Sequence, residues 1–449
     1  RRVGTMLRDG DECGASTLLS EGEGRLLLQT NESAWRLSTE SLSCKSAHGH
    51  SVSAWAVADL VGASADGEHI EIVSVPLRLE SCFSAAGRTL KRDRFHCEDD
   101  EKASSLVTAI RKAATGSALD QQEMLGLRCL VLINPYSGQA KAAAVWKRCK
   151  PLFDAAGSSV EVVQTTHAGH AHELAASLDR GAYDALVCVS GDGTLSEVLN
   201  GLMSRTDASA ALSSLALGTI PAGTGNSLSC SVLRGAGQPI DCLSAALLIV
   251  KRHAHQLDIW KVTQEHGSSG YAFLSLEWAL ASDIDIGSEA WRWMGELRFD
   301  LYALWRLLTH WRYTGSLRLR RSSGDWQTVG GTFLMVWACN LPWLNPKTQM
   351  APSARFSDGC ADVLYIQRAP RFSMLRSFLD MSSGQHVNAE WCEYEKVSAF
   401  ELVPVPRTPK QPGYVAVDGE KWPLATTRVE VLPSKLSIIG CVGDGPNRL

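Results

Sequence analysis

The sequence predicts an α/β plus β fold: a first lobe with a parallel sheet and flanking helices, then an antiparallel β-rich lobe, with a further β-rich module in front of both. Three observations lead to this prediction. Residues 126 to about 255 repeat a pattern of apolar strand, glycine-containing loop and helix. From about residue 256 short strands dominate, and residues 1–124 alternate short apolar and polar runs before one amphipathic helix. The expected domains are therefore 1–124, 126–255 and 256–449.

The segment ALVCVSGDGTLSEVLNGL, residues 185–202, carries the most information about the first lobe. It predicts a short buried strand, a glycine turn with one acid, and an amphipathic helix. Gly191 and Gly193 flank Asp192, so the backbone can approach a phosphate while one carboxylate stays exposed at the strand's end. Thr194 and Glu197 have the spacing of a capping box, which predicts where the helix begins.

Two further segments repeat this arrangement. An apolar strand from Cys129 to Ile133 leads into NPYSG, and a strand ending at Ile220 leads into the tight loop 221–225 and a helix from Asn226. Parallel strands bring such loops to one edge of a sheet, where open α/β sheets bind ligands. Neither standard phosphate motif fits, because Thr224 follows Gly223 where a P-loop has lysine and Leu228 replaces the last glycine of G-x-G-x-x-G. We therefore expect backbone N–H groups and a metal ion to hold the phosphates.

Four motifs, NPYSG, SGDGTLSEVLNGL, PAGTGN and VDGE (417–420), are similar to those of the diacylglycerol-kinase-type catalytic domain, and within it to the sphingosine kinases. The resemblance runs from about residue 126 to about 440 in the family's order. The segment 274–299, LSLEWALASDIDIGSEAWRWMGELRF, resembles the stretch with which sphingosine kinases recognise their lipid base. The resemblance implies an ATP- and Mg²⁺-dependent kinase that phosphorylates the primary hydroxyl of a sphingoid long-chain base.

This chemistry requires a carboxylate, because a primary alcohol is a poor nucleophile until a base accepts its proton. Asp192 is the only acid in the three glycine loops, and the resemblance supports it as that base. Together with Ser190, Gly191 and Gly193 it is expected to contact the substrate. The resemblance implies that Asp285 binds the amino and hydroxyl head of the base. Asp283, two residues away, can be confused with it, and the spacing to Ser288, Glu289 and Arg292 favours Asp285.

The resemblance also implies a set of residues that bind ATP, and the acids Asp418 and Glu420 are the second-lobe candidates for ordering Mg²⁺. Arg292 and Arg298 are six residues apart, about 120° around a straight helix, so both reach one nucleotide only if the helix begins between them or the site wraps around it. Besides the loop 190–193, the expected ATP-binding residues are Asn134, Pro135, Tyr136, Thr165, Thr166, His167, Ala168, Gly169, Glu197, Gly223, Thr224, Gly225, Arg292, Arg298, Asp418, Gly419 and Glu420.

Composition agrees with a cytoplasmic enzyme. A net charge of −4 gives no general attraction to nucleic acid, and no apolar run approaches the roughly 18 residues of a membrane-spanning helix. The start of the sequence, RRVGTMLRDG, has no apolar core typical of a signal peptide. Thirteen cysteines without a C-x-x-C pair favour reduced thiols. The histidines of HAGHAH (167–172) favour an exposed loop before a helix over a metal site, since no cysteine lies nearby.

In the first domain, the runs RLLLQT, SVSAWAVADLV and HIEIVSVPLRL predict strands, and DDEKASSLVTAIRKAA predicts a helix with Leu106, Val107, Ile110 and Ala114 on its apolar face. Several strands followed by one helix resemble a pleckstrin-homology-type module. Such a module could bind lipid headgroups or a protein, or it could pack on the kinase without a ligand. In the last domain, strands are expected at 333–339, 363–366, 399–403 and 429–432.

An apolar stripe at helical spacing runs between Trp291 and Tyr313, through Met294, Leu297, Leu301, Leu304, Leu308 and Trp311. It fits either a core helix or the wall of an alkyl-chain pocket, and we favour the pocket. Beyond it lie Arg306, Arg312, Arg318, Arg320 and Arg321, which form either a solvated face or a basic patch for anionic headgroups. The second alternative predicts peripheral association with membranes.

Other functions remain open. Ceramide kinase has a similar layout, and diacylglycerol kinase shares the catalytic domain. PAGTGN and the absence of a C-x-x-x-C-x-x-C motif favour the free base. A non-catalytic lipid-binding scaffold is disfavoured, because such a protein has no physical need for Asp192, Gly223, Gly225 and Glu420.

Overall fold

The computed structural model divides the chain into two compact units, which are taken in turn below. One comprises 1–76, 90–125 and 155–157, and the other 77–89, 126–154 and 158–449. The described residues are 19–21, 25–29, 33–38, 40–46, 52–66, 69–78, 86–97, 100–115, 126–137, 140–223, 225–265, 267–288, 291, 294, 301–302, 304–306, 312–321, 323–370, 374, 376, 380–406 and 413–441.

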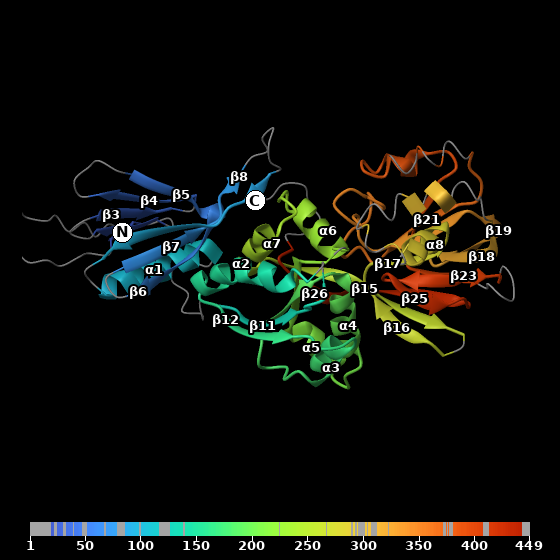
Figure 1. The fold of residues 1–449 in the computed structure, drawn as a ribbon, viewed down its shortest axis with the longest axis horizontal. Helices are drawn as coiled ribbons and strands as arrows, with labels where there is room; N and C mark the ends of the chain where they lie inside the picture. The colour runs from blue at the N-terminus through green and yellow to red at the C-terminus, as the bar shows by residue number, and fades with distance from the viewer. Residues whose placement is uncertain are drawn as a thin grey trace, which may run out of the picture. The chain divides into compact units, whose positions relative to one another are not determined.

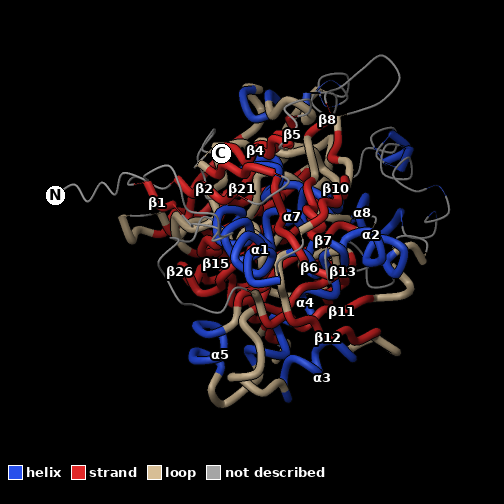
Figure 2. Tube along the Cα trace, turned by 90° about the vertical axis from the view of Figure 1, so that its left-hand side faces the viewer, coloured by secondary structure: helices blue, strands red, loops and turns tan. Residues whose placement is uncertain are grey.

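Among its described residues, the first unit contains two antiparallel sheets and one α-helix. The first sheet has the order β1 (Leu19–Glu21), β2 (Arg25–Gln29), β3 (Ser33–Leu37), β4 (Ser41–Ser46) and β5 (Val52–Ala56). The second sheet has the order β10 (Lys91–His96), β7 (His69–Ser74) and β6 (Leu60–Asp66). A 3-10 turn, η1 (Val57–Asp59), connects β5 to β6. Helix α1 (Asp100–Thr115) lies beside β6 and β7 (Figure 2) and buries Leu106, Val107, Ile110 and Ala114 as predicted. The likeness to a pleckstrin-homology module stays a prediction.

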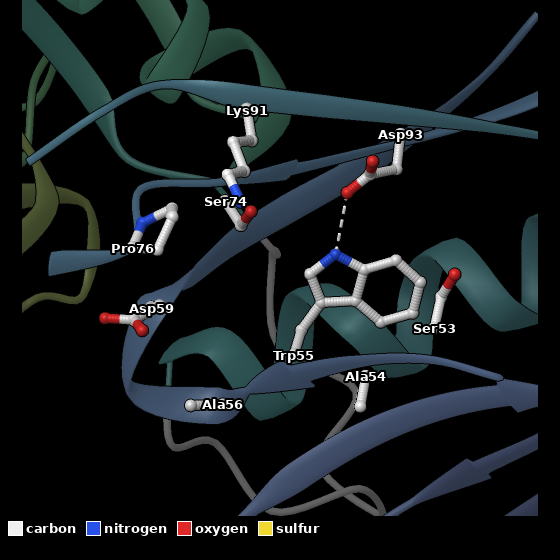
Figure 3. Close-up of a pocket in the computed structure, with 9 residues that line it drawn as sticks. All are labelled: Ser53, Ala54, Trp55, Ala56, Asp59, Ser74, Pro76, Lys91 and Asp93. Carbon is white, nitrogen blue, oxygen red and sulfur yellow. Dashed lines mark hydrogen bonds between the residues drawn. The ribbon is translucent and has the colours of Figure 1, made fainter. Parts of the chain in front are cut away.

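A shallow pocket opens on the same unit (Figure 3). The Trp55 indole N–H donates to Asp93 Oδ2 at 2.8 Å, which fixes the ring against one wall. Among the described residues that line the pocket, Lys91 is the one cation, and Asp59 and Asp93 are the acids. Because both signs of charge meet here, the pocket does not have the positive field that a phosphate site needs.

The nucleotide lobe is built on four parallel strands in the order β12 (Ser159–Gln164), β11 (Arg128–Ile133), β13 (Ala185–Ser190) and β14 (Ala216–Pro221). The three predicted strands are confirmed as neighbours. The sequence analysis did not predict β12, because its side chains are mostly exposed and so form no apolar run, as is common for an edge strand. The helices are α2 (Ala142–Ala155), α3 (His170–Ser177), α4 (Asp192–Met203), α5 (Ala208–Ser214), α6 (Ser227–Gly235) and α7 (Cys242–Val250).

The predicted parallel sheet is part of a larger mixed sheet that continues into the second lobe. β14 pairs in parallel with β26 (Thr427–Ile439), and β26 pairs antiparallel with β15 (Ala254–Gln264) and β23 (Ala399–Pro404). β16 (Ser269–Ala272), β18 (Tyr313–Arg320) and β19 (Trp326–Phe333) bring the sheet to ten strands among the described residues. Figure 1 shows the long β15 and β26 side by side in the middle of this unit. The two lobes are therefore held in register by shared backbone hydrogen bonds.

A second, antiparallel sheet has the order β22 (Glu393–Val397), β21 (Ala361–Ile366), β20 (Met335–Cys339), β17 (Ser275–Ala279), β24 (Tyr414–Val417) and β25 (Glu420–Pro423). Trp260, Trp278, Phe333 and Phe400 fill the core of this lobe. The remaining elements are β8 (Leu77–Arg78) paired with β9 (Gly87–Arg88), α8 (Leu280–Gly287) and the 3-10 turn η3 (Gln385–Asn388).

The predicted single strand over 333–339 is wrong. β19 ends at Phe333 in the ten-stranded sheet, and β20 begins at Met335 in the other sheet. Between them Leu334 donates its N–H to the carbonyl of Ile366. The run is apolar throughout because the chain passes from one buried sheet directly to the other, and hydrophobicity alone does not reveal such a change.

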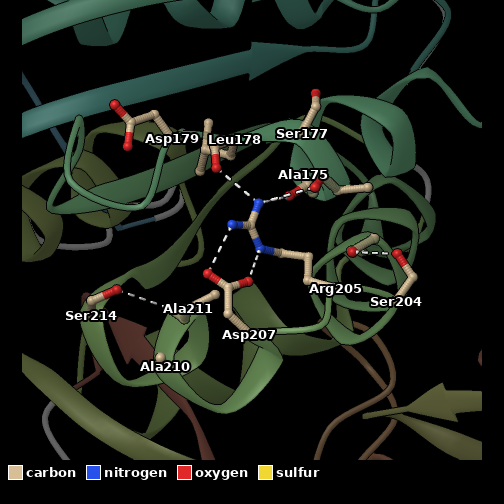
Figure 4. Close-up of polar contacts among 12 residues, drawn as sticks. Ala175, Ser177, Leu178, Asp179, Ser204, Arg205, Asp207, Ala210, Ala211 and Ser214 are labelled. Carbon is tan, nitrogen blue, oxygen red and sulfur yellow. Dashed lines mark hydrogen bonds and ion pairs between the residues drawn. The ribbon is translucent and has the colours of Figure 1, made fainter.

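Arg205 fixes the far ends of the two helices that carry site residues (Figure 4). Its guanidinium donates to both oxygens of Asp207, at 2.7 and 3.1 Å, and to the carbonyls of Ala176 and Leu178 at the end of α3, at 3.0 and 2.8 Å. These carbonyls have no partner within the helix, so the arginine satisfies them. Arg205 thereby ties the end of α3 to the turn that follows α4.

Candidate active site

The loops after β11, β13 and β14 are joined at one edge of the sheet. Gly191 and Gly223 come so close that a Cβ atom on Gly223 would lie 2.4 Å from the Cα atom of Gly191. The N–H of Ala222 donates to the carbonyl of Ser190, and the N–H of Gly191 donates to Ser137 Oγ at 3.0 Å. Only glycine allows two backbones to meet at this separation. The convergence of loops expected from the sequence is therefore present.

The predicted capping box of α4 is wrong. The helix begins at Asp192 with Gly191 as its N-cap, and no side chain caps it. Thr194 Oγ1 instead accepts a hydrogen bond from Asn134 Nδ2 at 3.2 Å, which connects α4 to the first loop. Glu197 accepts the N–H of Ala171 at 3.2 Å and so caps the neighbouring helix α3. Both side chains thus make contacts from α4 to other segments, and their local spacing in the sequence cannot reveal such contacts.

Asp192 is half-buried rather than exposed, which corrects the expectation from its glycine neighbours. Its Oδ2 accepts the N–H of Ser227 at 2.7 Å and its Oδ1 accepts the N–H of Leu228 at 3.3 Å. The carboxylate thus sits on the N-terminus of α6, where the helix dipole favours negative charge. Burial raises the pKa of Asp192, and these N–H donors oppose the rise.

In the second lobe, Asp418 is likewise a carboxylate held by backbone N–H groups. It lies in a two-residue turn between β24 and β25, with φ values of 50° at Asp418 and 79° at Gly419. An Asp-Gly pair favours this left-handed turn. The Asp418 carboxylate accepts the N–H groups of Phe273, Leu274 and Ser275 at 2.9, 2.9 and 3.1 Å. The turn is therefore fixed to the beginning of β17.

Four carboxyl groups gather between the lobes. Burial and the nearby Asp192 charge raise the pKa of Asp418 to about 7, although its three N–H donors oppose the rise. Glu277, buried on β17, has a pKa raised well above its usual range by burial and by the charges of Asp285 and Asp418. Asp285 Oδ2 lies 3.8 Å from where a Cβ atom on Gly419 would be. The proposed base and the proposed lipid-binding acid thus lie around one Asp-Gly turn.

The structure distinguishes Asp283 from Asp285. Two residues apart on α8, they point in different directions, because each helical residue turns the chain by about 100°. Asp283 accepts hydrogen bonds from the buried guanidinium of Arg306 and from the hydroxyl of Tyr313, which also contact each other at 2.7 Å. The Asp283 carboxylate is therefore already bound by Arg306 and Tyr313, whereas Asp285 lies beside Gly419 at the site.

Other predicted residues line the rim of the first lobe. Tyr136 is 81% exposed, and its N–H donates to Asn134 Oδ1 at 3.0 Å. The rings of His167 and His170 stack at 4.9 Å, and Thr166 contacts both. Pro135 is half-buried and Ala168 exposed, while Thr165 is buried and donates its N–H to the carbonyl of Ile133.

Some predicted residues lie outside the described residues. In the site these are Thr224, Glu289, Arg292 and Arg298, and in the apolar stripe they are Leu297, Leu308 and Trp311.

Sequence reasoning missed four residues. Ser137 and Asn226 brace the loops; the Asn226 side chain accepts from Gly223 N at 3.1 Å and donates to its carbonyl at 2.7 Å. Ser275 donates its hydroxyl to Glu277 at 3.0 Å. Ser137 and Asn226 stand inside the quoted motifs, so the loop motifs gave a signal for them. Ser275 and Glu277 stand in an apolar strand, and the acid in that strand was the available signal.

Two family matches cover most of this unit. Residues 128–262 match the family described as diacylglycerol kinase catalytic domain, and residues 282–440 match the YegS C-terminal NAD kinase beta sandwich-like domain. The sphingosine kinase 1 of Arabidopsis thaliana is 34% identical over 331 residues, which cover 65% of this chain and 68% of that protein. The sphingosine kinase 1 of Homo sapiens is 31% identical over 361 residues, 71% of this chain and 93% of that protein.

The chain belongs to the sphingosine kinase family. A sphingoid long chain base kinase 4 from Schizosaccharomyces pombe is 33% identical over 343 residues, which cover 68% of this chain and 73% of that protein. A crystal structure of a candidate diacylglycerol kinase from Bacillus anthracis str. Sterne has a TM-score of 0.55 at 19% identity, and the match covers 71% of this chain and 97% of that one. This likeness confirms the kinase fold of the two lobes. The protein is therefore a lipid kinase with an alcohol acceptor, and its family uses ATP as the phosphate donor.

A pair of glycine substitutions tests whether the edge between the loops is the ATP site. A Cβ atom on Gly193 would meet nothing within 4 Å among the described atoms, so Gly193→Ala should leave the melting temperature unchanged or slightly higher. It should nevertheless raise the KM for ATP about tenfold, because the methyl group fills space that a phosphate needs. Gly223→Ala should destabilise the fold by about 1–3 kcal/mol through its clash with Gly191. An unchanged KM in Gly193→Ala would remove this loop from the nucleotide site.

Proposed function

We propose that this protein transfers the γ-phosphate of ATP to the primary hydroxyl of a sphingoid long-chain base and releases the base 1-phosphate and ADP. The observation that carries the proposal is the placement of Asp192 and Asp285, from different lobes, around the Asp418–Gly419 turn. The names of the plant, yeast and human relatives, which are sphingosine or long chain base kinases, support the same substrate class.

Asp192 accepts the proton of the attacking hydroxyl. The oxygen then forms a bond to the γ-phosphorus as the bond to the leaving ADP oxygen breaks. The N–H groups of Ser227 and Leu228 hold the carboxylate in one orientation, and its raised pKa makes it a better proton acceptor than an exposed aspartate. Asp285 attracts the ammonium group of the base, which orients the hydroxyl towards Asp192.

Mg²⁺ is the implied metal, and it supplies charge neutralisation at the phosphates when bound. The described residues contain no group of three or more His, Cys, Asp or Glu side chains arranged to hold a metal ion. Mg²⁺ usually binds one or two carboxylates together with phosphate oxygens and waters, so the site still fits this ion. Both oxygens of Asp418 already accept N–H groups, whereas Glu420 is exposed at the start of β25. We therefore favour Glu420 as its protein ligand.

The test compares lipids side by side with labelled ATP: sphinganine, ceramide and diacylglycerol. The protein should phosphorylate sphinganine about tenfold better than ceramide or more, because an N-acylated base has no ammonium for Asp285 and adds a second chain. Ceramide belongs in the panel because the ceramide kinase of Mus musculus is 28% identical over 318 residues, 58% of each chain. Equal turnover of the two lipids would refute the assignment.

Asp192→Asn is the catalytic control for this assay. It keeps an oxygen for the N–H groups of α6 but removes the proton acceptor, so turnover should fall about 100-fold or more while ATP still binds. Asp154→Asn provides the matched comparison, since Asp154 is an exposed acid of the same lobe paired with Lys150. It should retain full turnover. Near-normal turnover of Asp192→Asn would exclude this residue as the base.

We further propose a cytoplasmic location with peripheral membrane association. The eleven described cysteines are free thiols, as a reducing compartment requires, and recovery of the protein from a secreted fraction would contradict this location. None of the described helices is long and apolar enough to cross a membrane.

For membrane contact, exposed apolar side chains are better candidates than the predicted basic patch. Leu301, Leu304 and Trp305 are 43%, 42% and 46% exposed, which corrects the expectation that Leu301 and Leu304 line an enclosed alkyl-chain pocket.

The arginines expected to form that patch are mostly engaged by acids. Arg318 pairs with Glu401 at 2.7 Å and Arg321 with Glu395 at 2.6 Å. Arg306 is buried against Asp283 and does not reach a surface. Arg320 donates to Ser398, and Arg312 is exposed. Charge alone therefore gives these residues little attraction for anionic headgroups, and insertion of the exposed apolar side chains becomes the main contribution.

Replacing Leu304 and Trp305 together with serine should weaken binding to liposomes about tenfold without changing turnover of detergent-solubilised base. Each buried apolar group that is lost removes transfer free energy on the order of 1 kcal/mol. Trp326→Ser is the matched control, because Trp326 is also an exposed indole, 37% exposed, but lies under Arg318 and Arg320 on β19. If the control weakened binding as much as the double variant, the contact surface would not be the 301–305 segment.

A further inference from the structure

Glu277 is a buried acid that the mechanism above does not use. It stands in the middle of β17, and only 4% of its surface is exposed. Its Oε1 accepts the Ser275 hydroxyl at 3.0 Å, whereas its Oε2 has no hydrogen-bond partner among the described residues. A buried carboxyl oxygen without a partner is unfavourable, because it has lost its water and gained nothing in return.

The surroundings do not explain a carboxyl group at this position. Ser275 and Glu277 lie on the same face of β17, and the strands on either side place Trp337 and Ala416 directly opposite Glu277. The Trp337 Nε1 is also buried without a partner among the described residues. Cys339 lies opposite Ser275. Glu277 forms no ion pair within the described part of the chain, so a leucine or methionine would suit this face better than an acid.

The acid is nevertheless adjacent to the proposed lipid head site. Ser275 connects the two, because its N–H donates to Asp418 at 3.1 Å and its hydroxyl to Glu277. Glu277 is two residues after Ser275 on β17, so it lies opposite Ala416 and past the Asp418–Gly419 turn. Same-face residues of a strand are about 7 Å apart. Glu277 therefore lies beyond the head group, where the chain of a bound base would begin.

We propose that Glu277 is a specificity-determining residue that hydrogen-bonds an additional hydroxyl on the sphingoid base, next to its amino-alcohol head. The preferred substrates are then 4-hydroxylated long-chain bases. This inference rests on the proposed function of the same site. The hydroxyl pairs with the free Oε2, and the Trp337 N–H lies on the strand opposite to add a donor. Burial and the charges of Asp285 and Asp418 favour the protonated form of Glu277, so the carboxyl can donate as well as accept.

Two bases that differ only in this hydroxyl test the proposal: 4-hydroxysphinganine and sphinganine, compared by kcat/KM. The protein should favour the hydroxylated base about tenfold or more, because sphinganine leaves the buried carboxyl oxygen without a partner. In Glu277→Leu the ratio should fall to within about twofold, with an unchanged or higher melting temperature, since an unsatisfied buried group is removed. Cys339→Ala, on the same face of the neighbouring strand, should keep the ratio of the unmodified protein.

Glu277→Gln gives a second, nearly isosteric variant should leucine disturb the fold. It should keep at least part of the preference, because an amide still pairs with a hydroxyl. If kcat/KM fell equally for both bases in Glu277→Gln, Glu277 would contact the ammonium group, and the hydroxyl assignment would be wrong. Equal use of both bases by the unmodified protein, or a ratio unchanged in Glu277→Leu, would also overturn the proposal. If neither base were phosphorylated while ceramide or diacylglycerol was, the proposed function itself would fail.

Discussion

The arrangement of the site depends on one interaction, the acceptance of three successive backbone N–H groups by the carboxylate of Asp418. These donors belong to 273–275, the residues that lead into β17, and α8 follows β17 directly. The interaction thus fixes the Asp418–Gly419 turn, the start of β17 and, through α8, the position of Asp285. The left-handed backbone at Asp418 aims its side chain back at these donors.

The two lobes use the same means to hold an acid. Asp192 accepts two N–H groups from the start of α6, as Asp418 accepts three from 273–275, and within the described residues neither carboxylate pairs with a cation. Backbone donors fix the position of a carboxylate without neutralising its charge. The site therefore keeps negative charge available for a substrate proton, an ammonium group and a metal ion. The cost is desolvation of the buried carboxyl group together with repulsion between neighbouring acids, and both raise the pKa of Asp418.

Local patterns in the sequence predicted what local physics determines. The strands before the glycine loops and the helix from Asp100 follow from apolar periodicity. Long-range contacts decided the remainder. Thr194 and Glu197 have capping spacing, but Asn134 in the first loop binds the Thr194 hydroxyl and Ala171 in α3 binds the Glu197 carboxylate. Spacing in the sequence already favoured Asp285 over Asp283, but the physical reason lies in Arg306 and Tyr313, which stand further along the chain and bind the Asp283 carboxylate. The predicted basic patch was also decided by long-range contacts, because Arg318 and Arg321 form ion pairs with glutamates on strands far along the chain.

The central claim is that Asp192 and Asp418 share one site across the two lobes. A double-mutant cycle with Asp192→Asn, Asp418→Asn and the double variant, measured as free energy of unfolding at pH 8 and pH 5, tests it directly. Asparagine suits both positions, because it tolerates the left-handed backbone and keeps an oxygen for the N–H donors. At pH 8 each single substitution relieves the same repulsion, so the double variant should be less stable than the sum of the single effects by on the order of 1 kcal/mol. At pH 5, below the Asp418 pKa of about 7, the acid carries its proton and the coupling should vanish. Additive effects at both pH values would show that the two acids do not sense each other, and would contradict the account.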